Sequence, residues 1–368
     1  MNRSARVPRS GGARWRRWTA IAALALAAAR AEPPRAAAEF DLRLRYVCRD
    51  EEKASPVSET RLRLEARWEA AVTETLTAVV ALGTSREGAP VSAEVTLGED
   101  LGDKPIALRT ASLAWRPETA PDVTVLLGKL EPPWARASDL IWDDDLRPEG
   151  GAARWRRRFD SLDLLAVAGA FVLRDDHDLD GADRAYLYAV QAAARRRWPD
   201  RSFVMLGAGA YPTDGRPPVA LAERGASAAP AVAVIPEPAP RYRPVEAFAA
   251  GTWELYFPVR GIVHYVVNPE ADRAREGWLA GLAVGRTEAV NGLEIDWRWR
   301  RIESDAVMAA FADDTLWAGT GRAEHRWRIS YRPFARLLLA LVWSEGRRLD
   351  ATGPDRLRAV TVEARAEF

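Results

Sequence analysis

Apolar and polar residues alternate along most of this chain, in stretches of about ten residues that end in turn residues. The plainest stretch is LEIDWRWR, whose apolar positions are Leu293, Ile295, Trp297 and Trp299 and whose charged positions are Glu294, Asp296, Arg298 and Arg300. Period-two alternation places successive side chains on opposite faces of a β-strand. Each stretch therefore predicts a strand with one apolar and one charged face, and the last of them ends the chain at Phe368.

The pattern predicts about sixteen such strands. Their ranges are near 39–49, 59–69, 74–84, 106–117, 122–130, 151–159, 162–173, 185–197, 201–211, 246–257, 261–267, 277–287, 292–302, 322–331, 335–344 and 356–368. Short connections alternate with long ones, and the long ones lie around 50–58, 85–105, 131–150, 174–184, 212–245, 268–276, 303–321 and 345–355. In an up-and-down meander every second connection lies at the same end, so this order sorts short turns to one end and long loops to the other.

This sorting favours a particular fold class. Outer-membrane barrels have an even strand number, short periplasmic turns and long extracellular loops. A spanning sheet must close on itself, because an open edge in hydrocarbon leaves backbone groups unsatisfied. We therefore predict an all-β fold, an up-and-down antiparallel transmembrane β-barrel over residues 39–368, with apolar faces toward lipid and charged faces toward water. The alternative is a soluble secreted β-sandwich, which has no reason to sort its loops.

The N-terminus has the order of a secretory signal peptide. An apolar run from Trp18 to Ala29 follows several arginines and leads into Ala29-Arg30-Ala31. This order predicts a signal peptide over residues 1–31 and a short lead over residues 32–38, with an N-terminal membrane anchor as the alternative. Removing residues 1–31 removes seven arginines and no acidic residue, so the 52 acidic residues then outnumber the basic ones by six. Such a chain has no global footprint for nucleic acid.

Composition agrees with a barrel rather than a helical bundle. The chain is 48% hydrophobic and 29% charged, and no apolar run reaches the roughly 20 residues of a spanning helix. Cys48 is the only cysteine, which rules out an internal disulfide. Tryptophan recurs at predicted strand ends, where rings with a polar edge favour the membrane interface. These residues are Trp68, Trp115, Trp155, Trp198, Trp253, Trp278, Trp297, Trp299, Trp327 and Trp343.

Acidic residues mark the connection over 131–150 as a candidate constriction. They are Asp143, Asp144, Asp145 and Glu149. If this loop folds into the barrel, its carboxylates would face the lumenal Arg154 and Arg156 and set a charge preference, as charged side chains do in pores. The alternative is a solvated, turn-capping loop.

Arginines on the charged faces of several strands form a second candidate, a ladder along the lumen. Its members are Arg43, Arg45, Arg61, Arg63, Arg298, Arg300, Arg326 and Arg328. The ladder would create an electric field across the pore. Alternatively, it pairs across strands with Glu65, Glu294 and Asp296.

The stretch DHDLDG offers the one candidate metal site. Asp176, Asp178 and Asp180 have the spacing of calcium-binding oxygen ligands. Leu187 stands where an EF-hand has its bidentate glutamate, so the choice lies between a weak surface calcium site and a solvated loop. No other cofactor is predicted. No catalytic motif is present, and His177, His264 and His325 are far apart, so no enzyme is predicted.

The connection over 212–245 is rich in proline and alanine. It is too dense in proline for a barrel strand and too long for an ordinary turn. We interpret it as a surface loop, with a domain linker as the alternative.

Several segments together resemble the putative porin family of Gram-negative bacteria. They are APVSAEVTLGED, KPIALRTASLAW, GKLEPPWARASDLIWDDDLRPEGGAARW, FPVRGIVHYVVNPEA and RIESDAVMAAFADDTLWAGTG. The likeness runs from about residue 40 to Phe368, and WDDDLRPEG is its most specific part. The chain departs from many members in lacking a helical, coiled-coil-like N-terminal extension, which leaves trimer alignment by such a part open.

The resemblance implies an outer-membrane porin, a passive diffusion channel for small hydrophilic solutes or ions. It also implies insertion by the barrel-assembly machinery, with the closing strand and Phe368 resembling the assembly signal, and it leaves a homotrimer open. Two other functions are kept as alternatives. One is a soluble secreted β-sheet protein that binds glycans, and the other is an outer-membrane barrel with hydrolase activity.

Overall fold

The computed structural model describes residues 36–52, 55–85, 93–98, 102–174, 184–215, 241–312, 319–349 and 355–368. Within them lie sixteen long strands and two strands of three residues. The long strands are β1 (Ala36–Glu51), β2 (Val57–Ala71), β3 (Leu76–Thr84), β5 (Ile106–Trp115), β6 (Val123–Lys129), β7 (Glu149–Arg158), β8 (Leu162–Arg174), β9 (Ala185–Arg197), β10 (Phe203–Ala210), β12 (Val245–Glu254), β13 (Pro258–Val267), β14 (Glu276–Gly285), β15 (Leu293–Ile302), β16 (Arg322–Phe334), β17 (Leu337–Arg348) and β18 (Arg356–Glu367). The short strands are β4 (Val95–Leu97) and β11 (Thr213–Gly215). Among the described residues, no helix has the length and apolar character to cross a membrane.

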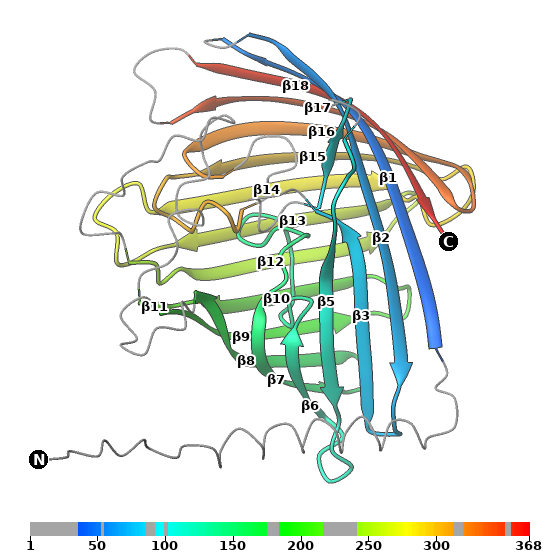
Figure 1. The fold of residues 1–368 in the computed structure, drawn as a ribbon, viewed down its shortest axis with the longest axis vertical. Helices are drawn as coiled ribbons and strands as arrows, with labels where there is room; N and C mark the ends of the chain where they lie inside the picture. Colours follow the sequence, from blue (N-terminus) through cyan, green and yellow to red (C-terminus); the bar gives the residue numbers. More distant parts are fainter. Residues whose placement is uncertain are drawn as a thin grey trace, which may run out of the picture.

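The strands form one closed antiparallel sheet (Figure 1). Each long strand pairs with the next long strand in sequence, and β1 closes the ring by pairing with both β2 and β18. Leu42 lies opposite Leu64 on one side and Ala366 on the other. Phe40 and Phe368 exchange two backbone hydrogen bonds of 3.1 and 2.9 Å at the seam. The predicted up-and-down barrel of about sixteen strands is confirmed.

The two short strands continue barrel strands that are interrupted. Beyond β3, β4 pairs with β2 at Thr60–Leu97, and beyond β10, β11 pairs with β9 at Leu187–Thr213. Each is therefore the outer part of a wall strand. Three residues are too few for an alternating pattern to predict.

The connections are sorted by length to the two ends of the barrel. The short turns are 72–75, 116–122, 159–161, 198–202, 255–257, 286–292 and 335–336, and they lie at the right and bottom of Figure 1. We call this the short-turn end and the opposite one the long-loop end. One predicted long loop is shorter than expected: β1 reaches Glu51 and β2 starts at Val57, so only residues 52–56 connect them.

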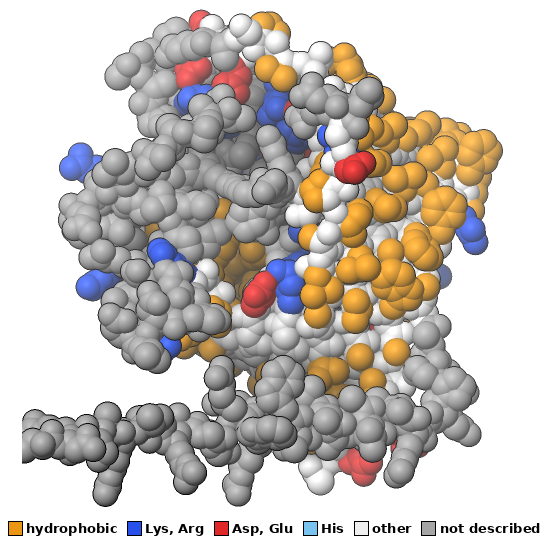
Figure 2. Space-filling view, in the orientation of Figure 1, with side chains coloured by type: hydrophobic (Ala, Val, Ile, Leu, Met, Phe, Trp, Pro, Cys, Tyr) orange, Lys and Arg blue, Asp and Glu red, His pale blue; other side chains and the backbone are white. Residues whose placement is uncertain are grey.

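The faces of the strands decide which way the sheet is turned. In β15, Leu293 is 52% and Ile295 is 44% exposed, whereas Asp296 between the strand's apolar positions is 8% exposed. Figure 2 shows hydrophobic side chains gathered on the outer face of the strands at the right of the view. A protein surrounded by water would not expose so many apolar side chains. A barrel with lipid outside and water inside would have this distribution. It contradicts the soluble sandwich.

Tryptophan is also on the outside. Of the ten residues predicted to form girdles, the exposed ones are Trp68, Trp115, Trp198, Trp253, Trp278, Trp327 and Trp343. Trp115, Trp198 and Trp253 lie beside short turns, and Trp278 lies near the long-loop end. Rings at both ends of the apolar band are typical of membrane barrels.

Three sequence predictions fall outside the described residues. They are the signal peptide over residues 1–31, the calcium candidate Asp176, Asp178 and Asp180, and most of the connection over 212–245. Within the part of the chain that is described, no group of three or more His, Cys, Asp or Glu side chains could hold a metal ion.

A charge on the outer face should destabilise the barrel. Leu341 lies in the middle of β17 with its side chain exposed. We expect Leu341→Arg to lower the free energy of unfolding by about 2–4 kcal/mol in lipid vesicles, the cost of an arginine near the bilayer midplane. The control Leu341→Phe keeps the position apolar and should stay close to wild type. Equal stability of all three proteins in a denaturant titration would place Leu341 in water.

Candidate functional site: the inner loop and the lumenal charges

The connection between β6 and β7, residues 130–148, folds into the barrel, and we call it the inner loop. Its apolar side chains are buried against the lumenal face of the wall, including Phe171 of β8 and Leu187 of β9. The buried members are Leu130, Trp134, Leu140, Ile141, Trp142 and Leu146. A channel-sized barrel would otherwise have a polar, watery interior here. The inner loop therefore fills one side of the lumen.

Contacts between aromatic rings stabilise the inner loop inside the barrel. Trp142 lies 4.5 Å from Trp134, 4.7 Å from Tyr211 and 5.3 Å from Phe311, between ring centroids. Phe311 belongs to the connection between β15 and β16, and its carbonyl accepts a 2.7 Å hydrogen bond from the backbone N–H of Asp143. Two connections that are far apart in sequence thus form one apolar core inside the barrel.

Polar contacts tie the inner loop to β9, β12 and β13. The side-chain amide of Gln191 bonds both backbone groups of Ala135, at 2.7 and 2.8 Å. Ser138 Oγ lies 2.7 Å from His264 Nδ1, and His264 Nε2 lies 2.9 Å from Glu246 Oε2. Gln191, His264 and Glu246 are all buried, so these contacts are shielded from water.

Asp139 ties the inner loop to β15 and β16. Its carboxylate lies 3.3 Å from Arg298 and 3.0 Å from Arg326. Burial by itself would raise the pKa of Asp139, but Arg326, Arg298 and Arg300 outweigh burial and lower that pKa well below its usual range. Asp139 is therefore a charged anchor at neutral pH.

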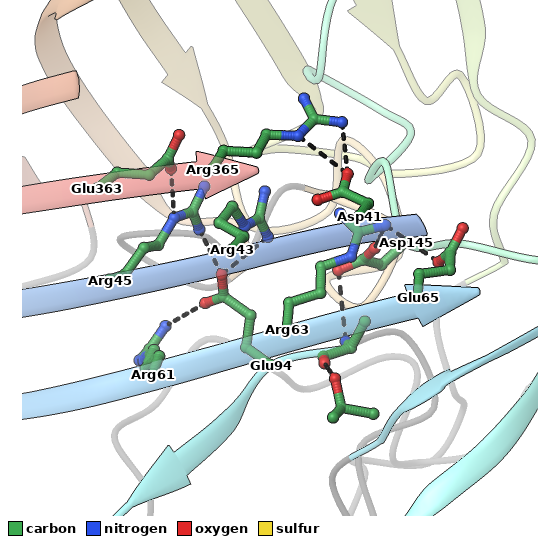
Figure 3. Close-up of polar contacts among 12 residues, drawn as sticks. Asp41, Arg43, Arg45, Arg61, Arg63, Glu65, Glu94, Asp145, Glu363 and Arg365 are labelled. Carbon is green, nitrogen blue, oxygen red and sulfur yellow. Dashed lines mark hydrogen bonds and ion pairs between the residues drawn. The ribbon is translucent and has the colours of Figure 1, made fainter. Parts of the chain in front are cut away.

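Asp145 ties the loop to the opposite part of the wall, as Figure 3 shows. Its carboxylate lies 3.0 Å from Arg63 on β2 and 3.4 Å from Arg109 on β5. Its backbone carbonyl also accepts a 2.6 Å hydrogen bond from Arg109. Burial would raise the pKa of Asp145, and the neighbouring arginines, with Arg63 the strongest, lower it.

Glu94 is the centre of the second charged cluster in Figure 3. Its carboxylate lies 2.8 Å from Arg43, 2.7 Å from Arg45 and 3.3 Å from Arg61. Arg45 also pairs with Glu363 of the closing strand, at 2.6 Å. Four segments of the chain therefore meet in one ionic network on the lumenal face.

The other ladder residues also have carboxylate partners. Arg328 lies 2.6 Å from Glu363, and Arg300 lies 2.9 Å from Glu324. The remaining pairs are Glu294 with Arg260 and Asp296 with Arg298. These residues lie on the inner faces of their strands, and the ladder arginines are paired with carboxylates rather than free.

The structure corrects the predicted acidic constriction. Glu149 begins β7 and shares the outward face of Ala153, where it pairs with Lys129. Asp143 is buried, and its Oδ1 accepts a 2.6 Å hydrogen bond from the N–H of Asp145. Asp144 is exposed and pairs with Arg136 at 2.8 Å.

None of these acidic residues pairs with Arg154 or Arg156 in the described structure. The prediction was wrong on this point because Asp145 pairs with Arg63 and Arg109, whereas Arg154 and Arg156 lie in the short-turn half of β7. Sequence reasoning also missed Glu94, Asp139 and Arg109. The apolar run Leu140-Ile141-Trp142 was the one available signal that this loop is buried.

Comparison with known proteins agrees with this architecture. A family model described as putative porin matches residues 42–214. The resemblance to the putative porin family is confirmed over these residues. No curated protein matches the chain.

Solved porin structures have the same fold at low sequence identity. Pseudomonas putida OprB, in its high-pH structure, is 9% identical with a TM-score of 0.61, and the match covers 90% of this chain and 94% of OprB. Salmonella typhi OmpF, in complex with daunomycin, is 10% identical with a TM-score of 0.54, covering 90% of this chain and 97% of OmpF. At this identity the likeness supports the fold and says nothing of the solute.

The inner loop should stay anchored until strongly acidic pH. Because the folded pKa values of Asp139 and Asp145 are lowered, their contribution is fully present above the usual aspartate pKa of about 3.9 and is lost as pH falls through the lowered values. We expect hydrogen exchange of residues 136–146, corrected for intrinsic rates, to stay slow from pH 7 to 4.5.

Asp139→Asn should speed this exchange already at neutral pH, whereas the exposed control Asp144→Asn should not. Loosening of the wild-type loop near pH 5 would contradict this account, as would slow exchange in Asp139→Asn.

Proposed function

We propose that this chain is an outer-membrane porin that passes small hydrophilic solutes or ions by diffusion. The observation that carries the proposal is the closed sixteen-strand barrel with apolar side chains outside and charged side chains inside. A barrel of this size is wide enough for an aqueous channel. Lumenal side chains keep contact with solvent: Arg260 remains 45% exposed although it pairs with Glu294.

The inner loop narrows this channel from one side. Its apolar core packs on β8 and β9, while its polar edge carries Asp139 and Asp145 toward arginines of β2, β5, β15 and β16. We infer that the path for solutes runs beside these ion pairs, along the part of the charged wall that the loop does not contact. Charged side chains on both sides favour hydrated solutes over apolar ones.

The outer membrane is the location that the barrel and the family match support. Export by the signal peptide over residues 1–31 and insertion by the barrel-assembly machinery complete the proposal. The closing strand supports it, since β18 has an apolar outer face and ends beside Phe368 at the seam. A homotrimer stays a prediction.

Ser138, His264 and Glu246 have the order of a hydrolytic triad, and we propose that they act as an anchor. The hydroxyl oxygen of Ser138 also accepts a hydrogen bond from the N–H of Leu140 at 3.2 Å. The second oxygen of Glu246 accepts hydrogen bonds from Tyr211 and Gln191. A nucleophile needs its oxygen free to reach a substrate, whereas each of these groups is engaged in holding the inner loop.

Reconstitution into planar bilayers tests the channel. The purified barrel should give stepwise conductance, and Asp139→Asn, which frees one edge of the inner loop, should change the size or noise of the steps. The control Asp144→Asn should match wild type. A folded barrel that inserts and stays silent would defeat the proposal.

Serine-directed labelling tests the anchor against the hydrolase alternative. A fluorophosphonate probe should leave the folded wild-type barrel unlabelled, because Ser138 is held by His264 and Leu140. Labelling that disappears in Ser138→Ala would favour an enzyme.

A further inference from the structure

Among the described residues, four arginines without a carboxylate partner collect in one part of the lumen, the short-turn half of β5 to β9. We call Arg116, Arg154, Arg156 and Arg195 the arginine cluster. Arg116 follows β5, and by strand alternation it faces the lumen because Trp115 before it is exposed outside. Arg154 and Arg156 share the inward face of the buried Ala152, and Arg195 shares that of Gln191.

Strand register brings three members of the cluster together. Arg154 lies opposite Thr124 of β6, and Trp115 lies opposite Val125, so Arg116 comes opposite Thr124 from the other side. Neighbouring strands are about 4.8 Å apart, which puts the backbones of Arg116 and Arg154 about 10 Å from each other. Arg156 is two residues further, about 7 Å along the same face. Side chains of this length can converge on one solute from these positions.

Among the residues that the structure describes, the cluster differs from the arginine ladder in its lack of carboxylate partners. The ladder arginines described above pair with Glu94, Glu363, Glu324, Asp139 or Asp145. Within the described ranges, no carboxylate oxygen lies within 4.0 Å of a guanidinium nitrogen of the four arginines in the cluster. Arg195 instead stacks on Phe203, with its guanidinium carbon 3.8 Å from the ring centroid.

Two of the acidic residues nearby, Asp163 and Asp122, are already engaged with other arginines. Asp163 lies 3.2 Å from Arg158 and 3.1 Å from Arg197. Asp122, at the turn before β6, reaches the outward-facing Arg157 at 4.0 Å. The positive charge of the cluster is therefore left for a mobile anion to balance, because like charges held close together repel one another.

We propose that the arginine cluster is a binding station for small polyanions, solutes with a phosphate group or with two or more carboxylates, and that it makes the channel prefer anions. This inference rests on the proposed porin function and names its substrate class. Guanidinium groups match phosphate and carboxylate oxygens in paired hydrogen bonds. The station lies between the inner loop and the short-turn end of the lumen. A solute that enters from the long-loop end would therefore meet it after the narrow part of the lumen.

Single-channel recording with a matched pair of variants tests this. Arg154→Gln with Arg156→Gln removes two lumenal charges. The control, Arg157→Gln with Arg196→Gln, removes two charges from the outward faces of β7 and β9. In a KCl gradient, wild type and control should give a reversal potential of the sign expected for anion preference, and the lumenal variant should give one closer to zero.

Block by a chosen polyanion provides a second readout. Inorganic pyrophosphate should interrupt the wild-type and control currents, and the lumenal variant should need about tenfold more for half block, as expected for the loss of charge-assisted contacts. Conducting channels with no anion preference, or with equal block in all three proteins, would overturn the inference and leave the porin function standing. Absence of conductance in a folded, inserted barrel would overturn the porin function itself.

Discussion

Closure of the sheet is the constraint on which the rest of this structure depends. In hydrocarbon each unpaired backbone group costs several kcal/mol, so a spanning sheet has to be a ring. The ring here is completed by β1, which pairs along its length with β2 and β18, and by the backbone contacts between Phe40 and Phe368. Once the ring is closed, a strand has only an outer and an inner face, and lipid takes the apolar one. The charged face is then turned to the lumen, and the outward charges that remain, such as Arg157 and Arg196, lie near strand ends.

The charges enclosed in the lumen must in turn be paired, because a buried ion without a partner is costly in free energy. Strand neighbours meet part of this demand, as Glu363 does for Arg45 and Arg328. Connections meet the rest. Glu94 enters from the segment before β4, and Asp139 and Asp145 enter on the inner loop. The same ion pairs that neutralise the wall therefore fix the loop that narrows the channel, while its apolar side packs on β8 and β9.

This division explains what the sequence could predict. Strand alternation is a local property, so all sixteen long strands and the outward face of Leu293 and Ile295 could be predicted from residues alone. The ion partners of the inner loop could not, because they depend on which strands closure brings opposite the loop. Glu149 shows why the faces of residues at strand ends are hard to predict. As the first residue of β7 it points outward. A strand boundary or register shifted by one residue would turn the same side chain toward the lumen.

The distribution of lumenal charge follows from the path of the inner loop rather than from the number of charges. After leaving β6, the loop places Asp139 against β15 and β16 and Asp145 against β2 and β5, above the short-turn half of the lumen. Asp139 and Asp145 therefore form ion pairs with those parts of the wall, and neither of them pairs with an arginine of β7 or β9. A loop of the same composition that turned the other way would neutralise Arg154 and Arg156 and expose the opposite wall. The charge that a solute meets is thus set by the apolar packing of Trp134 and Trp142, which fixes the direction of the loop.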